Sequence, residues 1–282
     1  MTAPLPPADA YLDLVGRALI NALHPDLGGR IVALVRDLLA AQGRAPTIPA
    51  IEQELARFFA PTASINLFDS SQWHSKIAGE PFTMSSPERL QNVREAAETV
   101  LRENIPGDFV ETGVWRGGLC IMMKAVLAAH AARRRLYVCD SFQGLPEISE
   151  GVDAPLKLHE NPLLAISVDQ VKENFTRFGL LDEDVVFVEG WFADTMPKLQ
   201  EEIGDISILR LDGDYYTSTR EVIDPLYDKV SPGGFIIVDD YGCYQQARDA
   251  IHDFWNERGL APELVQVDWT CHYWRKSGPL RE

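Results

Sequence analysis

Residues 206–216 read ISILRLDGDYY and residues 235–241 read FIIVDDY. In each stretch a mostly apolar run, typical of a buried strand, leads directly into carboxylates. If the two strands are neighbours in a parallel sheet, Asp212, Asp239 and Asp240 meet at one edge, because adjacent strands lie roughly 5 Å apart. No histidine or cysteine stands beside them, and oxygen ligands suit hard divalent cations. The pattern therefore predicts a Mg²⁺ site, with Mn²⁺ or Ca²⁺ as alternatives.

Each acid taken alone has a simpler interpretation. Asp239 and Asp240 would cap the next helix, and Asp212 with Gly213 would form a turn. Carboxylates that converge this closely repel one another unless a cation or a shared proton lies between them. The convergence of all three at predicted strand ends favours the metal.

Strand-like and helix-like segments alternate from residue 108 onward, which is typical of a mainly parallel sheet with helices on both faces. Only residues 268–270 separate the last two strand-like runs, a gap that suits an antiparallel hairpin. We therefore expect a Rossmann-like α/β fold whose sheet ends in a reversed edge strand. The seven predicted strands are 109–111, 136–140, 185–189, 206–211, 235–238, 264–267 and 271–274.

The region before residue 86 has a different, helical pattern. Apolar residues recur at helical spacing over 8–41, interrupted by Pro25 and a glycine pair, and a further helix is predicted at 48–59. Ser86 and Pro87 then open a helix that ends near residue 103, as expected for a cap and a first turn. We predict a helical extension over residues 1–85 and a catalytic domain over residues 86–282.

Composition excludes several classes of function. The 282 residues carry a net charge of −16 with a pI near 4.8, which disfavours binding to nucleic acid or to an anionic membrane. The longest apolar run, 119–132, is short and holds Lys124 and His130, so it is a poor membrane span. We see no signal peptide and no CxxC pair, and we expect a cytoplasmic protein with reduced thiols.

The predicted first strand leads into a glycine-rich turn, DFVETGVWRGG at 108–118. Such a turn lets a ligand approach the backbone at the carboxyl edge of the sheet, although many such turns are purely structural. Its spacing differs from the dinucleotide pattern GxGxxG. Glu111 would repel a pyrophosphate but attract an ammonium group. The turn therefore favours S-adenosylmethionine over a dinucleotide, and disfavours an oxidoreductase.

Other strand ends extend this interpretation. Asp140 would accept hydrogen bonds from ribose hydroxyls or, more simply, cap the end of its strand. Trp191 and Phe192 would either flank an adenine or belong to the hydrophobic core. A cation beside a methyl donor predicts methyl transfer to a hydroxyl, because the cation lowers the pKa of that hydroxyl. A nearby carboxylate then accepts the proton, and Asp212 and Asp214 are both candidates.

The segment 142–162 lacks periodicity and follows the second strand on the edge where ligands bind. A loop this long within a compact domain is often functional, so a mobile lid is one interpretation and a solvated insertion the other.

Six motifs in this order resemble the macrocin O-methyltransferase (TylF-type) family over residues 83–276. They are DFVETGVWRGG, VCDSFQGLP, VEGWFADTMP, LRLDGDYYTST, SPGGFIIVDDY and CHYWRKS. The resemblance implies a class I methyltransferase fold, dependence on S-adenosylmethionine and Mg²⁺, and methylation of a deoxysugar hydroxyl on a macrolide, aminocoumarin or similar natural product. It also implies a homo-oligomer whose N-terminal helices contribute contacts and the substrate entrance.

The resemblance also assigns site residues. The metal ligands would be Asp212, Asp239 and Asp240, and the proton acceptor Asp212 or Asp214. The cofactor site would be lined by Thr83, Met84, Glu111, Gly113, Asp140, Ser141, Ser167, Gly190, Trp191 and Phe192. Residues 40–80 depart from the family pattern, which bears on the acceptor substrate. The alternatives are a metal-dependent catechol or phenol O-methyltransferase and a non-catalytic S-adenosylmethionine-binding assembly protein.

Overall fold

The computed structural model describes residues 7–20 and 81–278. The chain divides into two compact units, one made of Met1–Gly16 with Ser86–Glu282 and the other of Arg17–Ser85. The helices predicted between residues 21 and 59 lie outside the described residues. The proposed roles of the N-terminal extension and the catalytic domain therefore stay predictions, and the first 16 residues group with the later unit.

Seven strands form one sheet in the order β3-β2-β1-β4-β5-β7-β6. The first five run parallel, and β7 runs antiparallel to both of its neighbours. The strands are β1 (Asp108–Thr112), β2 (Leu136–Asp140), β3 (Val185–Glu189), β4 (Ile206–Leu211), β5 (Val230–Val238), β6 (Val265–Gln266) and β7 (His272–Arg275). The mainly parallel sheet predicted from the alternating pattern is confirmed.

The antiparallel hairpin of β6 and β7 and the antiparallel last strand are also confirmed, but the expectation that the reversed strand lies at the edge of the sheet is wrong. The reversed strand β7 lies between β5 and β6, so the short strand β6 forms the edge. Burial accounts for this order. Trp274 of β7 is fully buried and needs the interior position, whereas Val265 of β6 is exposed.

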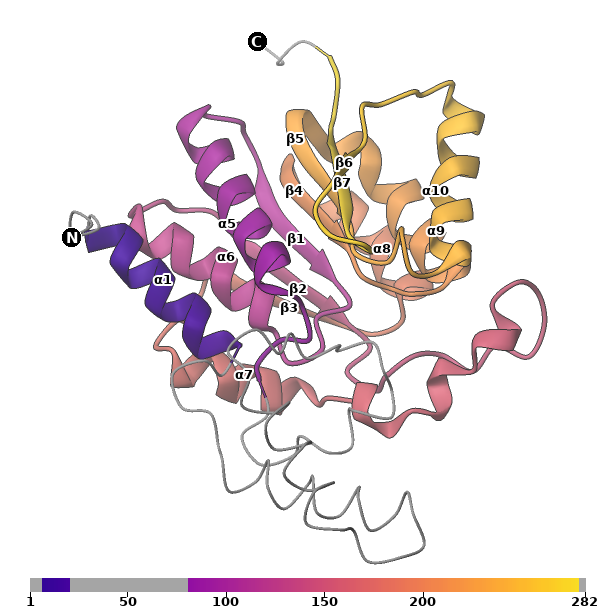
Figure 1. Ribbon diagram of the computed structural model, residues 1–282, viewed down its shortest axis with the longest axis horizontal. Helices are drawn as coiled ribbons and strands as arrows, with labels where there is room; N and C mark the ends of the chain where they lie inside the picture. The colour runs from indigo at the N-terminus through magenta and orange to yellow at the C-terminus, as the bar shows by residue number, and fades with distance from the viewer. Residues whose placement is uncertain (1–6, 21–80, 279–282) are drawn as a thin grey trace, which may run out of the picture. The chain divides into compact units, whose positions relative to one another are not determined.

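Helices cover both faces of the sheet. Figure 1 shows α5 and α6 on one side and α8, α9 and α10 on the other. A buried hydrophobic cluster packs the second group against β4 and β5 through Leu209, Leu211 and Ile236. The helices are α1 (Pro7–Leu19), α5 (Pro87–Arg102), α6 (Gly118–Ala129), α7 (Val168–Arg177), α8 (Phe192–Glu202), α9 (Tyr216–Leu226) and α10 (Gln245–Arg258), with 3₁₀ turns η1 (Ala154–Leu156), η2 (Leu158–Glu160), η3 (Pro162–Leu164) and η4 (Tyr227–Lys229).

The predicted start of α5 is confirmed in detail. The Ser86 hydroxyl accepts a hydrogen bond from the backbone N–H of Arg89, and Pro87 occupies the first turn. Leu90, Val93 and other apolar residues of this helix are buried. The cap and the buried face fix α5 beside the sheet, from where its side chains reach the site described below.

No described helix is both long and apolar enough to span a membrane. All four cysteines are free thiols, and three of them are buried: Cys120, Cys139 and Cys271.

Candidate active site

The residues that follow the parallel strands are tied into one row at the carboxyl edge of the sheet. Each donates its backbone N–H to the neighbouring strand, which extends the ladder by one residue and aligns the strand ends. The bonds run from Gly113 to Cys139 at 2.9 Å, from Asp212 to Thr112 at 2.9 Å, from Asp239 to Leu211 at 2.9 Å and from Gly190 to Asp140 at 3.0 Å. The structure thus places the predicted cofactor turn and the predicted metal ligands side by side.

Asp212, Asp214 and Asp240 form a carboxylate cluster in this row. One oxygen from each lies within 4.8 Å of the others. The backbone N–H of Asp214 donates to Oδ2 of Asp240 at 3.1 Å, and Asp214 adopts a left-handed backbone with φ 59°. This turn points the DGD segment back toward β5. An all-oxygen donor set of this kind fits a hard divalent cation.

Burial and mutual repulsion shift the proton affinities of this cluster. Removal from water, followed by repulsion from Asp239, raises the pKa of Asp212 to about 6. Burial together with the charges of Asp212 and Asp239 raises the pKa of Asp214 to about 8. The pKa of Asp240 is raised well above its ordinary range by the same causes. Without a cation, the cluster therefore holds protons that a bound cation would displace.

Asp239 lies beside this cluster and is bound to two arginines. Arg89 Nη1 donates to its Oδ2 and Arg210 Nη2 to its Oδ1, and all three side chains are buried. Arg89 also donates Nε to Asp268 at 2.7 Å. The predicted set of Asp212, Asp239 and Asp240 stays a prediction. In the structure Asp214, named from the sequence as a proton acceptor, joins the close group.

Arg210 connects the carboxylate cluster to Glu111 on the neighbouring strand β1. Its Nη1 donates to Glu111 Oε1 at 2.7 Å and to Asp212 Oδ2 at 2.8 Å. Arg210 is paired with Glu111 in the β1–β4 register, and Asp212 follows two residues later on the same face. Sequence reasoning missed Arg210 because it treated this residue as part of an apolar run. The sequence did contain a signal: Arg210 is a charged residue within a buried strand, and it lies two residues before Asp212, so both side chains lie on the same face.

Glu111 is held by the protein's own donors. One carboxylate oxygen accepts from Arg210 and the other from the Cys120 thiol at 2.8 Å. Burial raises the pKa of Glu111 to about 7, although Arg210 acts against the shift. Its predicted contact with the cofactor stays a prediction, and its observed contacts are with Arg210 and Cys120.

Asp140 organises the glycine-rich turn. Its carboxylate accepts hydrogen bonds from the backbone N–H groups of Val114 and Phe142, each at 2.8 Å. Gly113 has φ 78°, a conformation that favours glycine. The structure therefore brings Asp140 and Gly113 together, as their predicted shared role requires.

The remaining predicted cofactor residues occupy capping and turn positions. The Ser141 hydroxyl donates to the Gly144 carbonyl at 2.7 Å. Ser167 caps α7 by accepting from the Gln170 N–H at 3.3 Å. Trp191 is the N-cap residue of α8 and Phe192 its first residue. Thr83 and Met84 belong to the other compact unit.

Comparison with known proteins identifies the family. The model of the macrocin O-methyltransferase (TylF) family matches residues 8–276. The chain belongs to this family. It is 46% identical over 198 residues to the 8-demethyl-8-(2,3-dimethoxy-alpha-L-rhamnosyl)-tetracenomycin-C 4'-O-methyltransferase of Streptomyces olivaceus, covering 68% of this chain and 75% of that protein. It is 44% identical over 200 residues to demethyldecarbamoylnovobiocin O-methyltransferase of Streptomyces niveus, covering 69% and 76%.

A solved structure confirms the fold of this O-methyltransferase. The solved structure of the O-methyltransferase NovP is similar to it, with a TM-score of 0.76 and 35% sequence identity. The match covers 96% of this chain and 100% of NovP. The predicted class I fold of S-adenosylmethionine-dependent methyltransferases is thereby confirmed.

In this O-methyltransferase, segment 142–162 is tied to the start of α9, next to the carboxylate cluster. Asp153 is buried, and its two oxygens accept from the backbone N–H groups of Tyr216 at 2.8 Å and Thr217 at 2.9 Å. The Leu158 N–H also donates to the Tyr215 hydroxyl at 3.1 Å. Asp153 thus caps a helix from a distant segment, a contact that sequence reasoning missed. Whether the segment acts as a lid stays a prediction.

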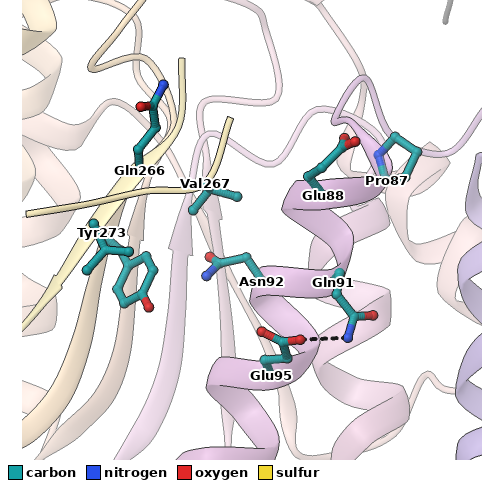
Figure 2. Close-up of a pocket in the computed structure, with 9 residues that line it drawn as sticks. Pro87, Glu88, Gln91, Asn92, Glu95, Gln266, Val267 and Tyr273 are labelled. Carbon is teal, nitrogen blue, oxygen red and sulfur yellow. Dashed lines mark hydrogen bonds between the residues drawn. The ribbon is translucent and has the colours of Figure 1, made fainter. Parts of the chain in front are cut away.

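A separate groove of about 450 Å³ lies between α5 and the β6–β7 hairpin (Figure 2). Glu88, Gln91 and Glu95 line its helix side, and Gln91 donates to Glu95 at 2.8 Å. No residue of the carboxylate cluster lines this groove. The candidate site therefore lies at the strand ends and not in this groove.

Proposed function

We propose that this O-methyltransferase uses S-adenosylmethionine and a Mg²⁺ ion to methylate a sugar hydroxyl of a glycosylated natural product. The observation that carries the proposal is the row of strand ends, which sets Asp212, Asp214 and Asp240 beside the turn at Gly113. The proposal includes a homo-oligomer, which rests on the family resemblance.

The acceptor class rests on the relatives. One is named for a rhamnosyl derivative of tetracenomycin C and the other for a demethyldecarbamoyl form of novobiocin. Both names describe elaborate natural products, and the first names a sugar. The acidic cluster favours a hydroxyl acceptor, because a cation there acts on an oxygen nucleophile.

The chain's own residues have distinct proposed roles. Asp212, Asp214 and Asp240 would hold the cation, with Asp239 behind them, and Gly113 and Asp140 would hold the cofactor. When bound, S-adenosylmethionine supplies an electrophilic methyl group, and the cation lowers the pKa of the acceptor hydroxyl. Asp212 already accepts a hydrogen bond from Arg210, which lowers its affinity for a further proton. Asp214 is therefore the better candidate to accept the hydroxyl proton at a carboxylate oxygen.

The test is methyl transfer from labelled S-adenosylmethionine to a matched panel of glycosides, their aglycones and simple catechols. We expect label only in the glycosides, and acid hydrolysis should release it with the sugar. Label in catechols or aglycones, without label in any sugar, would favour the phenol O-methyltransferase instead. Tight calorimetric binding of S-adenosylhomocysteine without turnover of any acceptor would favour the assembly protein.

A further inference from the structure

Arg210 stands out among the buried side chains of the described residues. Only 1% of its side chain is exposed, although it lies inside a strand whose neighbouring residues are apolar. It contacts carboxylates from three adjacent strands: Glu111 of β1, Asp212 after β4 and Asp239 after β5. A buried cation with this many partners costs considerable desolvation, and a hydrophobic residue would often give equal stability. This cost points to a role beyond packing.

The contacts of Arg210 differ in how firmly each partner is held. Glu111 and Asp239 are buried and have further donors, Cys120 and Arg89 respectively. The Asp212 side chain is 28% exposed, and Arg210 is the side-chain donor that the structure gives it. A single nitrogen, Nη1, binds both Glu111 and Asp212. The two buried acids therefore anchor the guanidinium, and the guanidinium in turn fixes the carboxylate of Asp212.

We infer that Arg210 is a positioning residue for the cation site, which orients Asp212 through a guanidinium anchored by Glu111 and Asp239. The inference rests on the proposed function, since it concerns the cation held by Asp212, Asp214 and Asp240. Partners that orient a metal ligand typically contribute ten- to hundredfold to metal affinity. The planar guanidinium provides this orientation because it carries donors in several fixed directions.

Replacement by lysine separates geometry from charge. The variant Arg210→Lys keeps one positive charge beside the site, so the electrostatic repulsion of a cation is nearly the same. A lysine ammonium is a point charge on a flexible stem and cannot reproduce the planar fork that reaches all three acids. If Arg210 only supplied charge, this variant would bind a divalent cation like the wild type.

The experiment measures Mn²⁺ binding by electron paramagnetic resonance of the free ion in wild-type protein and Arg210→Lys. We expect Mn²⁺ affinity to fall by about tenfold or more in the variant, with its fold intact by circular dichroism. The matched control is Arg220→Lys on α9, because Arg220 also binds two carboxylates, Asp224 and Glu257, but at the surface. The control should bind Mn²⁺ like the wild type.

A folded Arg210→Lys protein with unchanged Mn²⁺ affinity would overturn the inference. If Arg210→Lys does not fold, the second variant is Glu111→Gln. Glutamine keeps the shape of Glu111 but weakens its hydrogen bond with Arg210. We then expect severalfold weaker Mn²⁺ binding. Asp108→Asn at the opposite end of β1 controls for the lost charge and should have little effect. Unchanged Mn²⁺ affinity in Glu111→Gln would likewise contradict the inference.

Failure of the proposed function gives a different result. In that case wild-type protein would not bind Mn²⁺, or Asp240→Asn would bind it equally well. The inference about Arg210 fails when the wild type binds Mn²⁺, Asp240→Asn does not, and either Arg210→Lys or the fallback variant Glu111→Gln binds Mn²⁺ like the wild type.

Discussion

The backbone of Gly113 packs directly against Asp212. A Cβ added to Gly113 would lie 1.6 Å from the Asp212 carbonyl oxygen, and its φ of 78° disfavours any larger residue. The glycine-rich turn after β1 and the residue that follows β4 are thus in direct backbone contact, and only glycine permits it.

We expect Gly113→Ala to lower the free energy of unfolding by more than about 2 kcal/mol, because the added methyl group must displace backbone. Gly179→Ala is the control, since Gly179 also has positive φ, at 66°, but nothing lies within 4 Å of its added Cβ. That control should cost only about 1 kcal/mol. Urea denaturation measures the free energy of unfolding of both variants. Equal decreases in Gly113→Ala and Gly179→Ala would show that the contact with Asp212 adds no strain.

Asp153 caps the N-terminus of α9, whose own N-cap residue makes no side-chain hydrogen bond. Its removal should therefore destabilise both the start of α9 and segment 142–162. We expect Asp153→Ala to destabilise the protein by about 0.5–2 kcal/mol, the usual cost of losing a helix cap. Hydrogen exchange should accelerate at the amides of Tyr216 and Thr217, which Asp153 binds. Glu150→Ala in the same segment, where the side chain is exposed, is the control. Unchanged exchange at the two amides would contradict the capping role.

The carboxylate cluster should make the metal-free protein sensitive to pH. Folding raises the pKa of Asp212 to about 6 and of Asp214 to about 8, so the folded state holds protons that the unfolded state releases. The stability contributed by this proton binding is fully present below the ordinary carboxyl pKa of about 4 and is lost as pH rises toward 8. We expect the urea midpoint in EDTA to fall between about pH 4 and pH 8.

Asp214→Asn tests the source of this pH dependence. The amide cannot ionise, so the fall in the urea midpoint should be smaller than in the wild type. Asp249→Asn, at an exposed position on α10, should leave the fall unchanged. Saturating Mg²⁺ should stabilise the wild type more at the higher pH, because it binds the ionised form. The same fall in Asp214→Asn as in the wild type would refute the assignment to Asp214.

Local patterns predicted much of the fold and part of the candidate site. The helix start at Ser86 and the strand ends at Asp212 and Asp240 are encoded within a few residues, so the sequence reveals them directly. The order of β6 and β7 was less accessible, because it depends on which strand must bury a large side chain, Trp274. Such competition for an interior position appears only once the tertiary structure is known.

The contacts that sequence reasoning missed are long-range. Arg89 lies 150 residues from Asp239, and Asp153 lies 63 residues from Tyr216. Neither pair forms a local motif, since each partner is also common in solvated positions. Only the packing of α5 and of segment 142–162 brings them to the site. Arg210 was hidden differently, because it interrupts a buried strand that periodicity otherwise describes well.

The central claim is that the carboxylate cluster binds a divalent cation on which methyl transfer depends. The most direct measurement is the initial rate of methyl transfer to a glycoside acceptor after EDTA treatment and after Mg²⁺ is restored, in wild-type protein and in Asp240→Asn. We predict that EDTA abolishes transfer, that Mg²⁺ restores it in the wild type, and that Asp240→Asn stays inactive. Full transfer in EDTA, retained in Asp240→Asn, would contradict the claim.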